Sequence, residues 1–343
     1  MSQSGNTMQK NYIYSIKKLI FSLLILFFIT NQTVAQGKFE IGFALSTMQY
    51  EGEIGGRFPF IYNDLNNPTS RARPAGGINF GYHLTDFISF RGSINVGSVQ
   101  AADRLLKPEP DPAVVYKLTR NLSFRSPIIE AGITTEFYPL PVIFKRYGQN
   151  LGRFNPYIVA GFNFFRFNPR SIYLDKTGAL SWVDLKPLRT EGQGMPIANA
   201  PKEYSLNATS IPFGIGIRFN MNENISLALE WLNRTTSTDY LDDVSGRYID
   251  NAEFDKFFGA GTVQADQAKQ KANFPSWLNG VHVNGFLPTE PRGSLSKFND
   301  FYYTGSIKLL DFEIRLQYLG HHFRTFHYKQ SFLISEFLLL KRT

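Results

Sequence analysis

The sequence contains no cysteine, which excludes disulfide frameworks, thiolate metal sites and cysteine nucleophiles. Charged residues make up only 19% of the chain, and the net charge of +8 is not gathered into a dense Lys/Arg run. We therefore expect no nucleic-acid partner. Beyond residue 35 the sequence also lacks any apolar run near the roughly 20 residues that a membrane-spanning helix needs. A helical membrane protein is accordingly disfavoured.

The longest apolar run lies near the N-terminus and has the form of a secretory signal peptide. Lys17 and Lys18 precede the apolar stretch at 19–30, and small residues then occupy the −3 and −1 positions of a cleavage site before Gln36. The stretch is too short for a permanent transmembrane helix. We therefore expect residues 1–35 to direct the chain out of the cytoplasm.

Aromatic residues and glycine are abundant, with 32 Phe, 17 Tyr and 28 Gly, and they occur in alternating patterns. In KFEIGFALS at 38–46, large apolar residues alternate with Glu, Gly, Ala and Ser, the period of a β-strand with two unlike faces. The pattern recurs and predicts eight strands, at 39–46, 76–84, 88–96, 129–137, 157–165, 210–219, 224–234 and 300–310.

The connections between these strands alternate in length. The turns at 85–86 and 220–224 are short, and a moderate, Pro-containing segment at 138–156 joins the fourth and fifth strands. Four long connections remain, at about 51–74, 99–121, 168–204 and 237–299. Outer-membrane barrels place short turns in the periplasm and long loops outside the cell.

The fold prediction is an all-β protein with an eight-stranded up-and-down antiparallel transmembrane β-barrel over residues 36–310. Its short turns would be periplasmic, its long loops extracellular, and its location the cell outer membrane. Residues 311–343 lose the two-residue period, so we expect a divergent or poorly ordered C-terminal tail.

Alternation alone does not decide which face is wet, because a soluble lipocalin-like barrel alternates with its apolar side inward. Three features favour the membrane: opposed charges on the polar face, small residues on that face, and aromatic residues near strand ends, as in interfacial girdles. The predicted girdle comprises Phe39, Tyr50, Phe87, Phe137, Tyr138, Tyr157, Phe219, Trp231, Phe301 and Tyr303. The predicted lumen charge network comprises Glu40, Arg91, Glu130, Glu136, Arg218, Glu230, Arg234 and Lys308. A lumen so narrow and charged predicts a plug rather than a pore.

Candidate catalytic and metal-binding residues are few. No Ser–His–carboxylate set has a recognisable spacing, and we interpret His83 as a hydrogen-bonding residue of the lumen. Asp239, Asp242 and Asp243 do not fit the spacing of a 12-residue EF-hand loop, so we interpret them as a polar capping turn at the barrel mouth. Residues 266–274 could form a short helix on the last loop, and we interpret them as loop structure, not as a nucleic-acid patch. We therefore expect no enzyme activity, no cofactor and no metal.

Two phrases, TDYLDDVSG at 238–246 and NPY at 155–157, together with the order of the strand segments, resemble the PorG-type outer-membrane barrels. That family is linked to the type IX protein secretion system, and the resemblance covers about residues 37–310. It implies a non-catalytic component that associates with periplasmic secretion-system ring proteins as well as with outer-membrane lipid. It carries over no ligand or catalytic residue.

The contacts with ring proteins would come from loops and turns such as the 139–154 segment, which contains Lys145 and Arg146. Two alternatives stay open at this point. The first is a lipid-modifying barrel enzyme of the outer membrane, and the second is a soluble lipocalin-like ligand-binding barrel.

Overall fold

A computed structural model describes residues 38–55, 72–106, 108, 110–146, 153–222, 225–272, 277–278, 281–282, 291–293 and 299–314. The expected signal peptide at 1–35 and most of the expected tail, at 315–343, lie outside the described residues. Within the described ranges, no helix is both long enough and apolar enough to cross a membrane.

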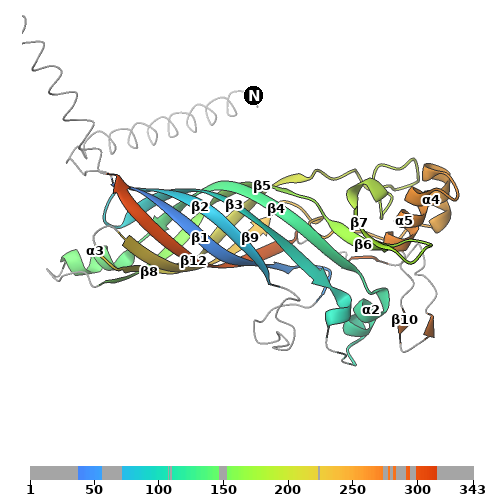
Figure 1. Ribbon diagram of the computed structural model, residues 1–343, viewed down its shortest axis with the longest axis horizontal. Coiled ribbons are helices and arrows are strands. Elements are labelled where there is room, and N and C mark those ends of the chain that lie inside the picture. Colours follow the sequence, from blue (N-terminus) through green and yellow to red (C-terminus); the bar gives the residue numbers. More distant parts are fainter. Residues whose placement is uncertain are drawn as a thin grey trace, which may run out of the picture. The chain divides into compact units, whose positions relative to one another are not determined.

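Eight antiparallel strands form a closed barrel (Figure 1). They are β1 (Lys38–Glu51), β2 (Arg73–His83), β3 (Ile88–Ala102), β4 (Ser123–Phe137), β5 (Phe154–Phe167), β8 (Asn207–Asn220), β9 (Ile225–Thr236) and β12 (Phe301–Ile314). The strands pair in the order β3-β2-β1-β12-β9-β8-β5-β4, and the pairing of β3 with β4 closes the barrel. This confirms the predicted eight-stranded up-and-down topology.

The last strand runs further than the sequence pattern predicted. The two-residue period fails after Leu310, but β12 continues to Ile314. Asp311 pairs with Ile41 of β1 and Ile314 pairs with Phe39, with a register shift between the two pairs. The hydrogen bonds between strands join backbone groups, so β1 holds this segment in the sheet although the polar–apolar period of the sequence shifts by one residue after Leu310.

The long connections are folded where they are described. They contain η2 (Asp103–Leu105), α2 (Pro112–Arg120), β6 (Arg170–Leu174), β7 (Leu180–Asp184), η3 (Lys186–Leu188), α4 (Asn251–Phe258), α5 (Val263–Ala272), β10 (Trp277–Leu278) and β11 (Val281–His282). We call the described residues within 51–55, 103–122, 168–206, 237–272, 291–293 and 299–300 the loop cap. In Figure 1 its helices lie at the end of the barrel opposite α3 (Pro139–Arg146), which occupies the connection between β4 and β5.

The structure decides between the two forms considered for residues 266–274. The segment is helical up to Ala272, because α5 covers Val263–Ala272, so the interpretation as plain loop structure is wrong for this part. Ala265, Ala268 and Ala272 are fully buried on one side of this helix. The segment is rich in Ala, Gln and Lys, which are good helix formers, and the alanine spacing lets the backbone pack closely on the cap.

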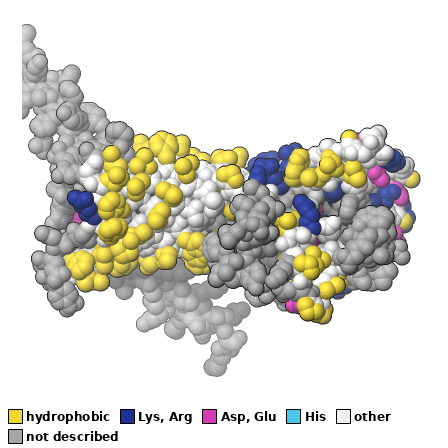
Figure 2. Space-filling model, turned by 60° about the horizontal axis from the view of Figure 1, so that its bottom comes forward, with side chains coloured by type: hydrophobic (Ala, Val, Ile, Leu, Met, Phe, Trp, Pro, Cys, Tyr) yellow, Lys and Arg dark blue, Asp and Glu magenta, His cyan; other side chains and the backbone are white. Residues whose placement is uncertain are grey.

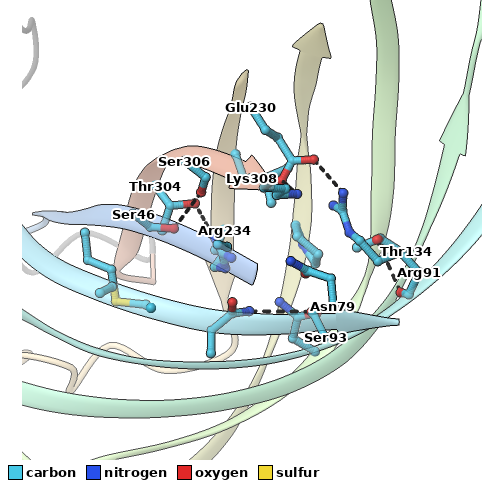
Figure 3. A pocket seen from close by; sticks show the side chains of 18 residues that line it. Ser46, Asn79, Arg91, Ser93, Thr134, Glu230, Arg234, Thr304, Ser306 and Lys308 are labelled. Atoms are coloured by element: carbon cyan, nitrogen blue, oxygen red, sulfur yellow. Dashed lines mark hydrogen bonds and ion pairs between the residues drawn. The ribbon is translucent and has the colours of Figure 1, made fainter. Parts of the chain in front are cut away.

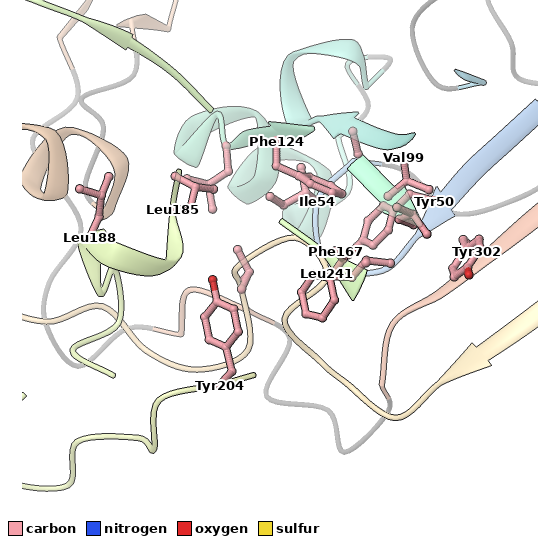
Figure 4. Close-up of a cluster of buried hydrophobic side chains, with 14 of the residues drawn as sticks. Tyr50, Ile54, Val99, Phe124, Phe167, Leu185, Leu188, Tyr204, Leu241 and Tyr302 are labelled. Atoms are coloured by element: carbon pink, nitrogen blue, oxygen red, sulfur yellow. The ribbon is translucent and has the colours of Figure 1, made fainter. Parts of the chain in front are cut away.

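The loop cap has its own hydrophobic core (Figure 4). Ile54, Leu185, Leu188 and Leu241 of the cap pack in one cluster with side chains from α4 and α5. The cluster also includes side chains that face inward near the loop ends of barrel strands, namely Met48, Val99, Phe124, Ile128, Phe167 and Tyr302. The cap core is therefore continuous with the lumen at the loop end of the barrel.

Candidate functional site in the barrel lumen

The outer face of the barrel wall is apolar (Figure 2). Phe80, Ile133 and Leu229 are 51%, 66% and 57% exposed on this face, whereas Glu130 on the opposite face is 1% exposed. Burying charged side chains while exposing large apolar ones is favourable only where hydrocarbon, not water, surrounds the wall. The chain thus has the architecture of an outer-membrane β-barrel.

The girdle prediction is wrong for three residues. Tyr50, Tyr138 and Tyr157 are each less than 5% exposed and lie inside. Tyr50 and Tyr157 occupy lumen-facing positions of their strands, and Tyr138 directly follows β4. Nearness to a strand end does not decide the face, whereas the parity of the residue along the strand does.

The middle of the lumen holds a branched ion-pair network (Figure 3). Arg91 of β3 lies 2.8 Å from Glu230 of β9 and also pairs with Glu136 of β4. Lys308 of β12 pairs with the second oxygen of Glu230, and Tyr157 donates a hydrogen bond to Glu230 at 2.9 Å. All the charged members are at most 5% exposed at their side chains. The network links opposite sides of the barrel.

A second pair lies nearer the loop cap. Arg234 Nε donates to Glu130 Oε2 at 2.7 Å, and Arg234 Nη1 donates to Thr304 at 2.7 Å. Glu130 also accepts hydrogen bonds from Tyr302 at 2.6 Å and from Asn95 at 3.0 Å. The buried charges are thus paired and hydrogen-bonded, as a low-dielectric interior requires.

The third group lies near the periplasmic ends of the strands. Arg218 of β8 donates to Glu40 of β1 at 2.5 Å, and His83 Nε2 lies 3.0 Å from the same carboxylate. With this group, each of the eight residues predicted for the lumen charge network has an ion-pair partner within that set. The set contains four carboxylates and four cations, so its formal charges balance.

Glycines let the large lumen side chains fit. A Cβ atom on Gly216 would lie 2.3 Å from the ring of Tyr157, and one on Gly132 would lie 1.8 Å from Asn163. Both distances are far below van der Waals contact, so only glycine leaves room for these neighbours. The small residues on the polar strand face thus reflect a crowded interior.

The space left between these side chains is small. The cavity drawn in Figure 3 has a volume of about 20 Å³, and its lining includes Arg91, Asn79 and Asn163. Asn79 Nδ2 and Asn163 Oδ1 have no hydrogen-bond partner in the described part of the chain. A cavity of this size accommodates about one water molecule, which these two atoms could bind. It is far too small for a passing solute.

His83 belongs to an arrangement that the sequence spacing did not indicate. Ser89 Oγ lies 2.6 Å from His83 Nδ1, and Glu40 lies on the other side of the ring. The turn after β2 makes His83 and Ser89 cross-strand partners, which a hairpin prediction could have revealed. However, Ser89 is 3% exposed, and Glu40 is engaged by Arg218. A nucleophile needs access to its substrate, so this geometry indicates a structural hydrogen-bond chain.

At the barrel mouth, one tyrosine joins two carboxylates of the loop cap. Tyr50 Oη lies 2.6 Å from Asp242 and 2.7 Å from Asp300, and it accepts the Glu53 N–H. A tyrosine hydroxyl has one proton, so one of the two aspartates must carry a proton of its own to complete both hydrogen bonds. Burial, reinforced by the nearby Glu53 carboxylate, raises the pKa of Asp242 and of Asp300 well above the ordinary value.

The Asp239–Asp243 turn is mostly held by protein groups. Asp243 accepts hydrogen bonds from Thr190 at 2.5 Å and Tyr204 at 2.6 Å, and Asp239 accepts one from Ser245. Arg292 is buried beside Asp243 and pairs with Glu191 at 3.3 Å. Burial nevertheless raises the pKa of Asp243 and Glu191.

Glu53, Asp239 and Asp300 also have carboxylate oxygens within 4.8 Å of one another, the type of ligand that Ca²⁺ takes. Asp300 is already hydrogen-bonded by Tyr50 and by the Leu241 N–H at 2.9 Å. The cluster therefore acts as a structural turn at the mouth, and proximity of acids alone does not establish a metal site.

The structure is similar to solved outer-membrane proteins. Neisserial surface protein A matches with a TM-score of 0.34 and 9% identity over 80% of this chain and 96% of that chain. Ail of Yersinia pestis matches at 0.32 and 8% over 80% and 97%, and E. coli outer membrane protein W at 0.29 and 10% over 80% and 97%. No protein-family model matches the chain, and no curated protein matches its sequence. Such low identities and scores transfer no function.

Proposed function

We propose that this protein is a non-enzymatic outer-membrane barrel that acts as a structural scaffold and conducts no solute. The ion-paired lumen carries this conclusion. Side chains from β3, β4, β9 and β12 meet across the barrel axis and leave a cavity of about 20 Å³. Towards the loop end of the barrel, the cap core fills the mouth. Opening a path would require separating buried ion pairs, which is costly.

The more specific proposal is a component of the type IX protein secretion apparatus that contacts periplasmic ring subunits. The resemblance of residues 155–157 and 238–246 to PorG-type barrels supports it. So does α3, which lies at the end opposite the loop cap and exposes Val142 and Ile143, each 47% exposed. The side chains of Lys145 and Arg146, which were also expected to make contacts, lie outside the described residues.

The two alternatives fit the structure less well. A lipocalin-like barrel encloses an apolar cavity, whereas this lumen is lined by paired charges. A lipid-modifying enzyme is favoured by one observation, the approach of Ser89, His83 and Glu40. The burial of Ser89 and the engagement of Glu40 by Arg218 oppose it.

Capture of ring subunits from solubilised membranes tests the scaffold. The full-length protein should retain periplasmic ring proteins, and Val142→Asn with Ile143→Asn should lose them. Val115→Asn with Val263→Asn is the matched control, because both of its residues are exposed apolar side chains of the loop cap, at the opposite end. Equal recovery by all three proteins would place the docking surface elsewhere, and no recovery by any would refute the secretion role.

Conductance tests the absence of a pore separately. The protein inserted in planar bilayers should show no stable single-channel current. Steady conductance with an intact loop cap would contradict the proposal that the lumen is plugged.

A further inference from the structure

Three arginines lie on the outer face of the wall, next to the loop cap. Arg125 of β4 is the direct cross-strand partner of Arg170 of β6. Arg166 of β5 pairs with Ile129, which lies four residues from Arg125 and on the same face of β4. Three strands therefore bring three guanidinium groups to one side of the barrel. We call Arg125, Arg166 and Arg170 the arginine row.

Among the described residues, only one of the three positive charges of this row is balanced by an acidic side chain. Asp184 of β7 pairs with Arg170 at 2.5 Å. In the part of the chain that the structure describes, neither Arg125 nor Arg166 has an ion pair, and Arg125 Nε is buried without a hydrogen-bond partner. Like charges placed directly opposite each other on a sheet destabilise it. An external anion would relieve this repulsion and supply the missing acceptor.

The row lies where the apolar wall ends. Phe164 precedes Arg166 by two residues on the same face and is 64% exposed, and Ile129 is 57% exposed. Figure 2 shows basic side chains gathered at this boundary, between the apolar band and the loop cap. With the long loops outside the cell, the boundary is at the headgroup level of the outer leaflet.

A cavity of about 210 Å³ adjoins the row. Its lining includes Gln100, the cross-strand partner of Arg125, and Ser171, the residue after Arg170. Arg104 and Trp182 also line it, and Trp182 is 48% exposed. The guanidinium group and the exposed aromatic ring beside this space suit a sugar ring, which presents hydroxyl groups on its edges and C–H groups on its faces. The Ser171 hydroxyl donates to the Ser123 carbonyl at 2.7 Å, so towards a sugar it acts as an acceptor.

We propose that the arginine row and the adjoining cavity bind a phosphorylated glycolipid of the outer leaflet, with its phosphate on the arginines and its sugar in the cavity. The acyl chains would then lie along the apolar wall beside Ile129 and Phe164. This site does not depend on the secretion role, because it requires only that the wall be embedded in the membrane.

Native mass spectrometry of the full-length protein in neutral detergent can test the site. The probe is bisphosphorylated lipid A, compared with its dephosphorylated form, with phosphatidylglycerol and with phosphatidylcholine. We expect the wild-type protein to retain the bisphosphorylated lipid preferentially. Arg125→Gln with Arg166→Gln should weaken this retention roughly tenfold or more, as expected for the loss of two cations at a headgroup.

The matched control is Lys176→Gln with Lys202→Gln, which removes two exposed positive charges elsewhere in the loop cap. It should bind as the wild type does, and heat-modifiable gel migration should show that both variants are folded. Equal weakening by the control would reduce the effect to net charge and overturn the site. Equal retention of phosphatidylglycerol would also overturn the proposal, because it would indicate a site for anionic lipids in general. Complete displacement of lipid A by inorganic phosphate would overturn it too, because it would indicate a site for free phosphate.

Discussion

The barrel and the loop cap are built with opposite polarity. In the barrel, apolar side chains face outward and charged side chains such as Glu130 and Arg234 are enclosed. In the cap, apolar side chains such as Leu241 and Phe254 are enclosed, as in a water-soluble domain. The comparison shows that each region buries whatever its surroundings solvate least: hydrocarbon solvates charge poorly, and water solvates apolar surface poorly.

The change of polarity can be followed along a single strand. The lumen-facing positions of β1 are Glu40, Gly42, Ala44, Ser46, Met48 and Tyr50. The first is ion-paired, whereas Met48 and Tyr50 belong to the hydrophobic core that continues into the cap. The lumen thus becomes an ordinary protein core as the wall leaves the membrane.

The largest effect is expected from a variant that leaves one buried charge of the barrel unpaired. Arg234→Met removes the cation from Glu130, which is 1% exposed, and should lower the free energy of unfolding by about 4 kcal/mol. Urea unfolding of the refolded protein in lipid vesicles, followed by gel mobility, measures this loss. Adding Glu130→Gln to the same chain should restore most of it, because a neutral amide needs no cation. A double variant as unstable as the single one would show that charge pairing is not what matters.

A cavity in the cap should have a more local effect. Leu241→Ala removes a fully buried side chain and should destabilise the cap by about 3 kcal/mol. Amide hydrogen exchange should accelerate in α4 and α5, while the gel mobility of the folded barrel stays unchanged. If the barrel strands exchanged faster to the same extent, the two regions would form one cooperative unit.

The carboxylates at the barrel mouth predict a dependence of cap stability on pH. Burial raises the pKa of Asp239 to about 7, and the pKa values of Asp242 and Asp300 are raised in the same direction. The folded state then binds more protons than the unfolded state, so cap stability should be highest below the ordinary carboxyl pKa and should fall as pH rises towards 7. For Asp239, which is partly exposed, we expect a loss of about 1–2 kcal/mol.

Hydrogen exchange of the cap between pH 4 and pH 8, corrected for the intrinsic pH dependence of exchange, measures this change. Asp239→Asn should flatten the profile between pH 5 and pH 7. A cap that becomes more stable as pH rises over this window would mean that the carboxylates are ionised in the folded state.

The smallest effect should come from an ion pair that water reaches. Lys269 lies 2.8 Å from Asp255, and both side chains are about one-third exposed. Lys269→Gln should change the stability of the cap by less than about 0.5 kcal/mol, because solvent screens the pair. The same hydrogen-exchange measurement on α4 and α5 detects any change. A loss comparable to that of Arg234→Met would show that location does not control the strength of these pairs.

Much of the barrel could be predicted because side-chain alternation is a local property. The parity of Phe39, Ile41 and Phe43 assigns three side chains to one face without any knowledge of the partner strands. The same parity rule would have assigned Tyr50 and Tyr157 to the lumen. The prediction instead assigned them to the girdle, because both lie near strand ends. The error arose from using position along the strand instead of parity.

The loop cap was harder to predict because its elements have short or absent apolar periods. α5 is stabilised by three buried alanines, and alanine is too weakly hydrophobic to mark a helix face in the sequence. The approach of Ser89 to His83 follows from the short turn between β2 and β3, but the approach of Glu40 depends on the register of β1 with β2 across a long connection, which residue spacing does not reveal. Arg125 and Arg170 meet only because β6 pairs with the loop end of β4.

The sequence by itself determined the number of strands, the two faces of each strand and the alternation of short and long connections. These follow from the two-residue period of an extended chain and from the turn residues between strands. Only the tertiary structure decided which charges pair across the lumen, that a folded cap closes the mouth, and that three strands each place an arginine at the edge of the apolar wall. Those features depend on the register in which distant strands close the barrel, because register fixes which side chains from different strands occupy the same level.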